Sequence, residues 1–156
     1  MRIGHGYDVH RFIKERDLYL GGIKIDYQYG LKGHSDADVV IHALMDAMLG
    51  ALALGDIGTI FPDNDDNFKN IDSKLLLEKV VSLLGNYELV NADITIIAQQ
   101  PKLKEYIPKM RKVLAAIINV PTDRISIKAT TEEGLGFTGR KEGIACHAVC
   151  LLNNKN

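Results

Sequence analysis

The segment GHSDADVVIHALMDAMLGALAL, residues 33–54, predicts a helix that is buried around most of its circumference. A surface helix carries its apolar residues on one stripe, whereas here they occur on nearly all sides. Either Ser35 or Asp36 is a suitable N-cap, and Gly55 ends the helix. The apolar positions are Val39, Val40, Ile41, Leu44, Met45, Met48, Leu49 and Leu52. Other elements must therefore cover this helix, and the fold is built around it.

Three polar residues, Asp38, His42 and Asp46, interrupt this apolar surface at intervals of four. The spacing places them in one narrow line on a single face of the helix. Burying a carboxylate costs several kcal/mol unless a counter-charge is present. We therefore expect a cation beside this line.

The stretch GYDVHRF, residues 6–12, predicts a strand that carries Asp8 and His10 on one face. With His42 they offer one carboxylate and two imidazoles, a set that zinc accepts. Three protein ligands and an open fourth position are typical of a catalytic zinc site, where Asp46 orients a ligand or holds a substrate hydroxyl. The alternative is a group of separate solvated or capping residues, because spacing alone does not show that strand and helix meet.

The composition is that of a globular chain, and we expect one domain over residues 1–156. Hydrophobic residues make up 46% and charged residues 25%, which excludes a disordered chain. The 19 Lys and Arg residues balance 20 Asp and Glu residues, so no overall basic field favours nucleic acid. No apolar run reaches the roughly 18 residues that a membrane span needs, and the N-terminus lacks a signal-peptide pattern. Two cysteines in one strand-like run, Cys146 and Cys150, fit small core residues in a reducing cytoplasm.

Strand and helix signals alternate along the second half of the chain, which favours an α/β (α+β) fold. We expect a single domain with a mixed β-sheet and helices packed on one face. The segments 55–68 and 132–143 are expected to be loops. The expected strands cover 1–10, 89–101, 124–131 and 144–152, with a hairpin over 18–27 that turns at Gly21 and Gly22, and the further helices cover 72–84 and 104–119.

The remaining histidines give weaker signals. His34 directly precedes the expected N-cap, where spacing favours a loop residue over a group that positions a substrate. His5 and His147 lie on expected strands without a partner at ligand spacing, so we expect them to be structural.

Five segments, taken in order, resemble the family of 2-C-methyl-D-erythritol 2,4-cyclodiphosphate synthases over essentially the whole chain. They are GYDVHRF (6–12), the segment from GHSDAD to GDIG (33–58), FPDND (61–65), IIAQQPKL (96–103) and KATTEEGLGFTGRKEGIAC (128–146). The resemblance implies a phosphorus-oxygen lyase of the non-mevalonate route to isoprenoids. Such an enzyme converts 4-diphosphocytidyl-2-C-methyl-D-erythritol 2-phosphate into the cyclic diphosphate and CMP. It is a homotrimer with an active site at each subunit interface.

The resemblance also implies the residues of that site. Zinc falls on Asp8, His10 and His42, and a magnesium or manganese ion that bridges the diphosphate falls on Glu133. The positions for transition-state stabilisation are His34 and Thr131. The substrate contacts in one subunit are Ser35, Asp46, Asp56, Gly58, Phe61, Asp63 and Asp65. The neighbouring subunit binds the cytidine through Ala98, Pro101, Lys102, Leu103, Lys104, Ala129 and Thr130. Glu132 is a further substrate contact.

The resemblance also concerns a cavity on the threefold axis and the choice between two glutamates as ligand of the second metal. Phe137 and Arg140 fall near the threefold axis, where the family has an apolar cavity able to take an isoprenoid diphosphate. Ile3, His5 and Tyr7 line the same cavity, with Tyr7 at a position where the family more often has Phe. Glu132 stands where a neutral residue is commoner, so whether it or Glu133 reaches the second metal stays open, with Glu133 favoured.

Two other functions fit the same ligands. A zinc phosphohydrolase would pass the phosphoryl group to water, but would have no need of the cytidine pocket that AQQPKL and KATT imply. A non-catalytic trimer would hold a structural metal, against which three ligands and an open fourth position argue.

Overall fold

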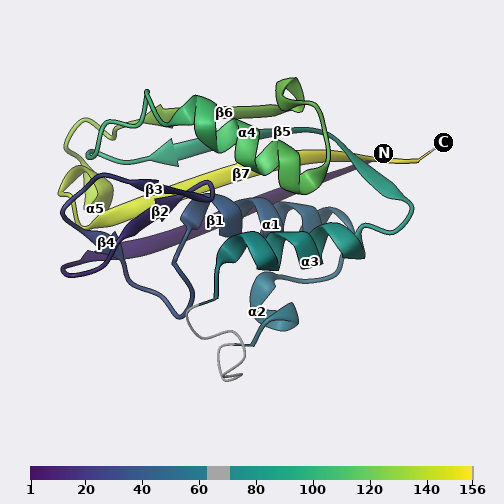
Figure 1. Ribbon diagram of the computed structural model, residues 1–156, viewed down its shortest axis with the longest axis horizontal. Helices are drawn as coiled ribbons and strands as arrows, with labels where there is room; N and C mark the ends of the chain where they lie inside the picture. Colours follow the sequence, from purple (N-terminus) through teal and green to yellow (C-terminus); the bar gives the residue numbers. More distant parts are fainter. Residues whose placement is uncertain (63–70, 156) are drawn as a thin grey trace.

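A mixed β-sheet is the framework of the protein. The computed structural model describes residues 1–62 and 71–155, so the predicted substrate contacts Asp63 and Asp65 lie outside the described residues. Among the described residues, the sheet has five strands in the order β4-β1-β7-β5-β6, and only β5 and β6 run parallel (Figure 1). The strands are β4 (Gly30–Leu31), β1 (Arg2–Ile13), β7 (Gly143–Asn154), β5 (Tyr87–Ile97) and β6 (Ile125–Thr130).

The helices cover one face of this sheet. Helix α1 (Val39–Ala51) packs on β1 and β7, and α4 (Ile107–Ile118) packs on β6. Helix α3 (Ser73–Leu83) lies outside both and contacts α1 and α4 (Figure 1). The predicted α+β architecture, a mixed sheet with helices on one face, is confirmed.

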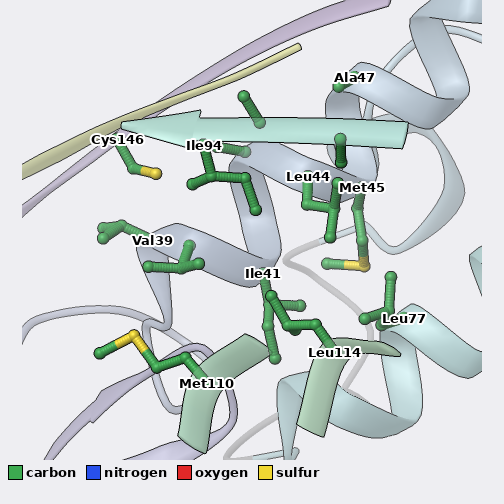
Figure 2. Packing of buried hydrophobic residues seen from close by; sticks show 14 of the residues in the cluster. Val39, Ile41, Leu44, Met45, Ala47, Leu77, Ile94, Met110, Leu114 and Cys146 are labelled. Carbon is green, nitrogen blue, oxygen red and sulfur yellow. The ribbon is translucent and has the colours of Figure 1, made fainter. Parts of the chain in front are cut away.

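The core lies between α1 and its neighbours. Figure 2 shows Ile41, Leu44 and Met45 of α1 directed toward Leu77 of α3, Leu114 of α4 and Ile94 of β5. Of the 13 residues of α1, all except Asp46 and Gly50 are buried, as the sequence predicts. Both cysteines are free and buried in β7, and burial raises the pKa of the Cys150 thiol to about 11.

Two glycines allow α1 to lie directly on β1. A Cβ atom at Gly6 would stand 1.9 Å from the carbonyl oxygen of Ala43, and one at Gly4 would stand 1.8 Å from that of Ala47. Both distances are far shorter than any real contact, so only glycine permits this approach. Because successive even-numbered residues of β1 share a face, Asp8 and His10 follow Gly4 and Gly6 toward the helix.

The helix begins at a different residue from those predicted. Asp38, and neither Ser35 nor Asp36, is the N-cap of α1, and its carboxylate accepts hydrogen bonds from Val40 N and Ile41 N. Ala37 adopts a left-handed φ of 58°, which ends the preceding turn and delays the helix.

The same carboxylate holds the hairpin of β2 (Leu18–Leu20) and β3 (Ile23–Ile25), which turns at Gly21 and Gly22 as predicted. Gly21 N donates to Asp38 Oδ1 at 2.9 Å, and Gly22 N donates to Oδ2 at 2.7 Å. Four backbone N–H groups therefore satisfy the buried carboxylate of Asp38. Asp38 therefore needs no counter-cation of its own, and of the predicted line it is His42 that belongs to a group able to hold a metal ion.

Replacing Asp38 with alanine should lower the free energy of unfolding by roughly 3 kcal/mol or more, since it removes an N-cap and leaves buried N–H groups unsatisfied. The matched control is Asp72→Ala, because Asp72 caps α3 at an exposed position by accepting from Lys74 N. That change should cost only about 1 kcal/mol. Urea unfolding of both variants measures the difference, and equal losses would contradict the role given to Asp38.

The predicted loops contain short helices. Helix α2 (Ile57–Ile60) interrupts the 55–68 segment, and α5 (Gly136–Gly139) interrupts 132–143. In α2 the carboxylate of Asp56 is the N-cap, which accepts from Thr59 N at 2.8 Å. A four-residue helix is too short to give a periodic apolar signal, so the sequence shows only its polar composition.

The face of the sheet opposite the helices carries large apolar side chains in solvent. On β1, Ile3 is 72% exposed, Tyr7 44% and Val9 41%, and on the adjacent β7 Val149 is 40% exposed. These residues occupy odd-numbered positions, on the face opposite Gly4, Gly6 and Asp8. Among the described residues, no helix is long and apolar enough to cross a membrane.

Candidate metal centre

Three side chains from β1 and α1 converge where the strand and the helix meet. Asp8 Oδ2 lies 3.0 Å from His10 Nε2 and 3.0 Å from His42 Nδ1, and the two ring nitrogens are 3.3 Å apart. Strand alternation aims Asp8 and His10 at the helix, and His42 faces them from its first turn and a half. The structure therefore brings together the three residues that the sequence analysis proposed as zinc ligands.

The outer nitrogen of each ring has its own partner. His10 Nδ1 donates to the carbonyl oxygen of Lys32 at 2.7 Å, which leaves Nε2 of His10 as the nitrogen that faces inward. His42 Nε2 lies 3.1 Å from Ser73 Oγ and 3.2 Å from Ser35 Oγ, which leaves Nδ1 facing inward.

This donor set fits a divalent metal ion. One carboxylate oxygen and two imidazole nitrogens all lie within 4.8 Å of one another, and each ring is oriented from outside by a hydrogen-bond acceptor. Two neutral imidazoles and a carboxylate are ligands that zinc takes in catalytic sites.

The charges of the three residues support one another. Burial opposes ionisation of Asp8, but hydrogen bonds and charges from His10 and His42 outweigh it and hold the pKa of this carboxyl well below its usual range. Burial likewise disfavours protonated His10, yet Asp8 raises the pKa of His10 above its ordinary value. The centre is thus built around a carboxylate anion that attracts positive charge.

Further predicted site residues lie around this centre. Ser35 is buried beside His42, whereas His34 is exposed. Asp46 is half-buried, and its Oδ1 accepts from Ile57 N at 2.8 Å, which ties α1 to α2. Burial, with a further contribution from Asp56 and Asp8, raises the pKa of the Asp46 carboxyl. The remaining residues predicted here are Gly58, which lies in α2, and Phe61, which is buried directly after it.

The segment after β6 carries the two glutamates. The carboxylate of Glu132 accepts a hydrogen bond from the buried hydroxyl of Thr138 in α5. Glu133 is exposed with a left-handed φ of 53°, and its backbone N–H donates to Thr131 Oγ1 at 3.3 Å. Glu132 is therefore engaged within its own loop, while Glu133 projects beside Thr131.

The residues predicted for a cytidine pocket gather at one end of the β5–β6 pair. Ala129 and Thr130 pair with the last residues of β5, and Ala98 N donates to the carbonyl oxygen of Thr130 at 3.0 Å. Pro101, Lys102, Leu103 and Lys104 follow directly. Asp8 is aligned with Ala129 across β7 and β5, three strand spacings or about 14 Å away. The structure does not join this group to the metal centre of the same chain.

Some contacts were missed from the sequence. His5 Nε2 lies 3.0 Å from His147 Nδ1, a contact that the spacing along the sequence does not reveal. They meet because β1 and β7 pair antiparallel with Tyr7 opposite His147. Ser73 was not considered at all, although the sequence DSK at the start of α3 offered a small polar residue there.

Fold and centre together define a class: an α+β chain whose sheet and buried helix form a three-ligand site suited to a catalytic metal ion. The model of the YgbB family matches residues 1–153. A curated 2-C-methyl-D-erythritol 2,4-cyclodiphosphate synthase of Clostridium perfringens is 58% identical over 97% of this chain and 99% of its own length. One of the same name from Lachnospira eligens is 56% identical over 99% of this chain and 85% of its own. The chain therefore belongs to the YgbB family, an enzyme family, and its predicted resemblance to these synthases is confirmed.

Solved structures share the fold. The bifunctional IspDF from Campylobacter jejuni has a TM-score of 0.96 at 44% identity, and the match covers 99% of this chain and 42% of that longer one. IspF of Plasmodium falciparum, in complex with CDP, has a TM-score of 0.87 at 39% identity over 99% of this chain and 97% of its own.

Proposed function

We propose that this chain converts 4-diphosphocytidyl-2-C-methyl-D-erythritol 2-phosphate into 2-C-methyl-D-erythritol 2,4-cyclodiphosphate with release of CMP. The observation that carries the proposal is the convergence of Asp8, His10 and His42 in a chain 58% identical to synthases of that name. The reaction is an in-line attack of the 2-phosphate on the β-phosphate, which makes the enzyme a phosphorus-oxygen lyase.

The reaction needs positioning and charge neutralisation more than acid–base catalysis. The 2-phosphate is already an anion near neutral pH, and CMP leaves as a phosphate anion. Two mutually repelling phosphates must be brought into line, and the charge of the transferring phosphoryl group must be balanced.

The residues of the centre take these tasks. We assign zinc to Asp8, His10 and His42, and a magnesium or manganese ion to Glu133. When bound, these ions supply Lewis-acid neutralisation and a template for the diphosphate. His34 and Thr131 stabilise the transferring phosphoryl group by donating hydrogen bonds, and Ser35 contacts the substrate.

Asp46 and Asp56 hold the methylerythritol hydroxyls, with Gly58 and the 61–65 segment nearby. Each carboxylate already accepts a backbone N–H through Oδ1, which fixes its orientation. The second oxygen of each is the acceptor we assign to a substrate hydroxyl. The role of Asp63 and Asp65 rests on the sequence resemblance alone.

The active enzyme is a homotrimer with its sites between subunits. Two observations support this assembly: the exposed apolar face formed by Ile3, Tyr7, Val9 and Val149, and the separation of the cytidine-pocket residues from the metal centre of the same chain. A neighbouring copy of the chain would cover the exposed apolar face and would bring its own cytidine-pocket residues to the metal centre. The CDP complex of the Plasmodium falciparum relative supports a cytidine nucleotide as the ligand.

The threefold axis of that trimer would enclose a cavity that accepts an isoprenoid diphosphate. Phe137 is half-buried, and Arg140 is exposed with Nε donating to Glu142 Oε1 at 2.7 Å. We assign the diphosphate of this ligand to the remaining guanidinium N–H groups of Arg140. We also assign the enzyme to the cytoplasm.

Phosphorus NMR tests the proposal directly. Purified protein with the substrate, zinc and magnesium should give the cyclic diphosphate and equimolar CMP, and chelation should abolish both. CMP with a linear, water-opened product would replace the proposal with a phosphohydrolase. Intact, zinc-loaded protein without turnover would refute catalysis and leave a structural metal.

Glu133 and Glu132 can be separated by paired substitutions. Glu133→Gln should raise the magnesium concentration for half-maximal turnover by at least about tenfold, because it removes the charged ligand. Glu132→Gln should change this concentration little, since the carboxylate of Glu132 is engaged with Thr138. Magnesium titration of both variants measures the effect, and a larger shift for Glu132→Gln would reverse the assignment.

A further inference from the structure

The outer nitrogen of His42 is the first member of a chain of hydrogen bonds that leads away from the metal centre. His42 Nε2 lies 3.1 Å from Ser73 Oγ, and Ser73 Oγ donates to Asp36 Oδ1 at 2.5 Å. His42 is 7% exposed, and Ser73 is fully buried. The three residues come from α1, the first position of α3 and the turn before α1.

The direction of this chain follows from the hydrogens available. A carboxylate only accepts hydrogen bonds, so the single hydroxyl hydrogen of Ser73 belongs to the bond with Asp36. Ser73 Oγ must then accept from His42 Nε2, which places a ring hydrogen on Nε2 and leaves Nδ1 as the nitrogen that can give its lone pair to a bound metal ion. Nδ1 faces Asp8 Oδ2 and His10 Nε2, at 3.0 Å and 3.3 Å, the two atoms with which it would share that ion.

Asp36 is itself held on several sides. Ser73 N donates to its Oδ2 at 3.0 Å, and Asp38 N donates to its Oδ1 at 3.2 Å. The backbone N–H of Asp36 donates to Ile71 O at 3.3 Å. These bonds join the turn before α1 to the start of α3. The carboxylate of Asp36, which is the final acceptor in the series of hydrogen bonds, is therefore fixed before any ligand binds.

Ser35 does not replace Ser73 in this arrangement. Its Oγ also lies 3.2 Å from His42 Nε2, but it accepts from Ala37 N and has no carboxylate to receive its own hydrogen. It contacts the ring without determining which nitrogen carries the proton.

We propose that Asp36 and Ser73 are positioning residues that fix the tautomer and orientation of His42 and thereby strengthen metal binding at Nδ1. The inference rests on the metal centre of the proposed function and adds the polar partners behind it. Residues of this kind, placed behind a histidine ligand, change metal affinity about 10- to 100-fold when they are removed.

Zinc competition with a chromophoric chelator tests the proposal on the full chain. Ser73→Ala should weaken zinc binding by about tenfold or more. The control is Asp72→Ala, which removes the N-cap of the same helix without contacting His42. It should lower stability but leave zinc affinity unchanged. Equal zinc affinity in Ser73→Ala and the unsubstituted chain would overturn the proposal, and so would an equal loss in Asp72→Ala.

Nitrogen-15 NMR of the zinc-loaded protein gives the second readout. His42 should carry its hydrogen on Nε2, and Ser73→Ala should produce a mixture of tautomers. A hydrogen on Nδ1 in the unsubstituted chain would overturn the proposed direction. If the unsubstituted chain does not bind zinc, the proposed metal centre itself is refuted. If Ser73→Ala cyclises the substrate normally with unchanged zinc affinity, only the positioning role of Ser73 and Asp36 is refuted.

Discussion

Replacing His42 with alanine should reduce cyclisation by at least about a thousandfold, because on the proposed function it removes one of three metal ligands and with it several kcal/mol of transition-state stabilisation. Zinc content of the purified variant should fall in parallel. His42 brings Nδ1 to the centre from a buried position, and among the described residues no other group of three His, Cys, Asp or Glu side chains lies at ligand distance. Elemental analysis and phosphorus NMR of the same preparation measure both effects.

The His42→Ala substitution also creates a cavity in the core, so a control variant with a comparable cavity is needed. Met45→Ala truncates a fully buried residue on the same helix and should cost roughly 2–5 kcal/mol of stability. Its side chain lies toward Leu77 in the core (Figure 2), so the variant should retain zinc. If Met45→Ala loses zinc as completely as His42→Ala, the loss reports a loosened helix and the ligand role of His42 is unsupported. Collapse of the His42→Ala assembly would favour a structural metal.

The group of Asp8, His10 and His42 was predictable because it depends on local periodicity. Strand alternation fixes the common face of Asp8 and His10, and the burial of α1 makes a polar His42 conspicuous. What the pattern leaves open is whether the strand and the helix meet. Gly4 and Gly6 carried that information, since glycines at alternate positions of a strand mark a close backbone approach.

The contacts that were missed from the sequence share a different origin, namely partners that are distant along the chain. Asp38 is satisfied by the hairpin at Gly21 and Gly22, 17 and 16 residues earlier, and no periodicity reports such a bond. His5 meets His147 only through the register of β1 against β7, over 142 residues. Chain topology decides these contacts, so composition and spacing do not reveal them.

The close approach itself gives the second large expected effect. Gly6→Ala should lower the free energy of unfolding by roughly 3 kcal/mol or more, because the added Cβ would stand 1.9 Å from Ala43 O and 2.8 Å from Ala47 N. Both are backbone atoms, so no side-chain rotation relieves the clash. The helix must move away from the strand.

The matched control is Gly50→Ala in the same helix. A Cβ at Gly50 has as its nearest atom His5 O, at 3.9 Å, so it fits without displacement. This change should stabilise the protein by about 0.5–1 kcal/mol, through the ordinary helix preference for alanine. Urea unfolding should therefore show that the same substitution lowers the free energy of unfolding at Gly6 and raises it at Gly50. A similar change at both positions would contradict the close packing of α1 on β1.

The same pair of variants connects the fold to the metal centre. Gly6 is two residues before Asp8 on the same face, so moving α1 outward from Gly6 also moves His42 away from the strand ligands. Zinc affinity should consequently fall in Gly6→Ala under conditions where the variant remains folded, and should be unchanged in Gly50→Ala. A folded Gly6→Ala variant with full zinc affinity would mean that the centre tolerates a wider separation. If zinc is lost with the fold intact, the two glycines determine the position of the metal site as well as the packing of the helix.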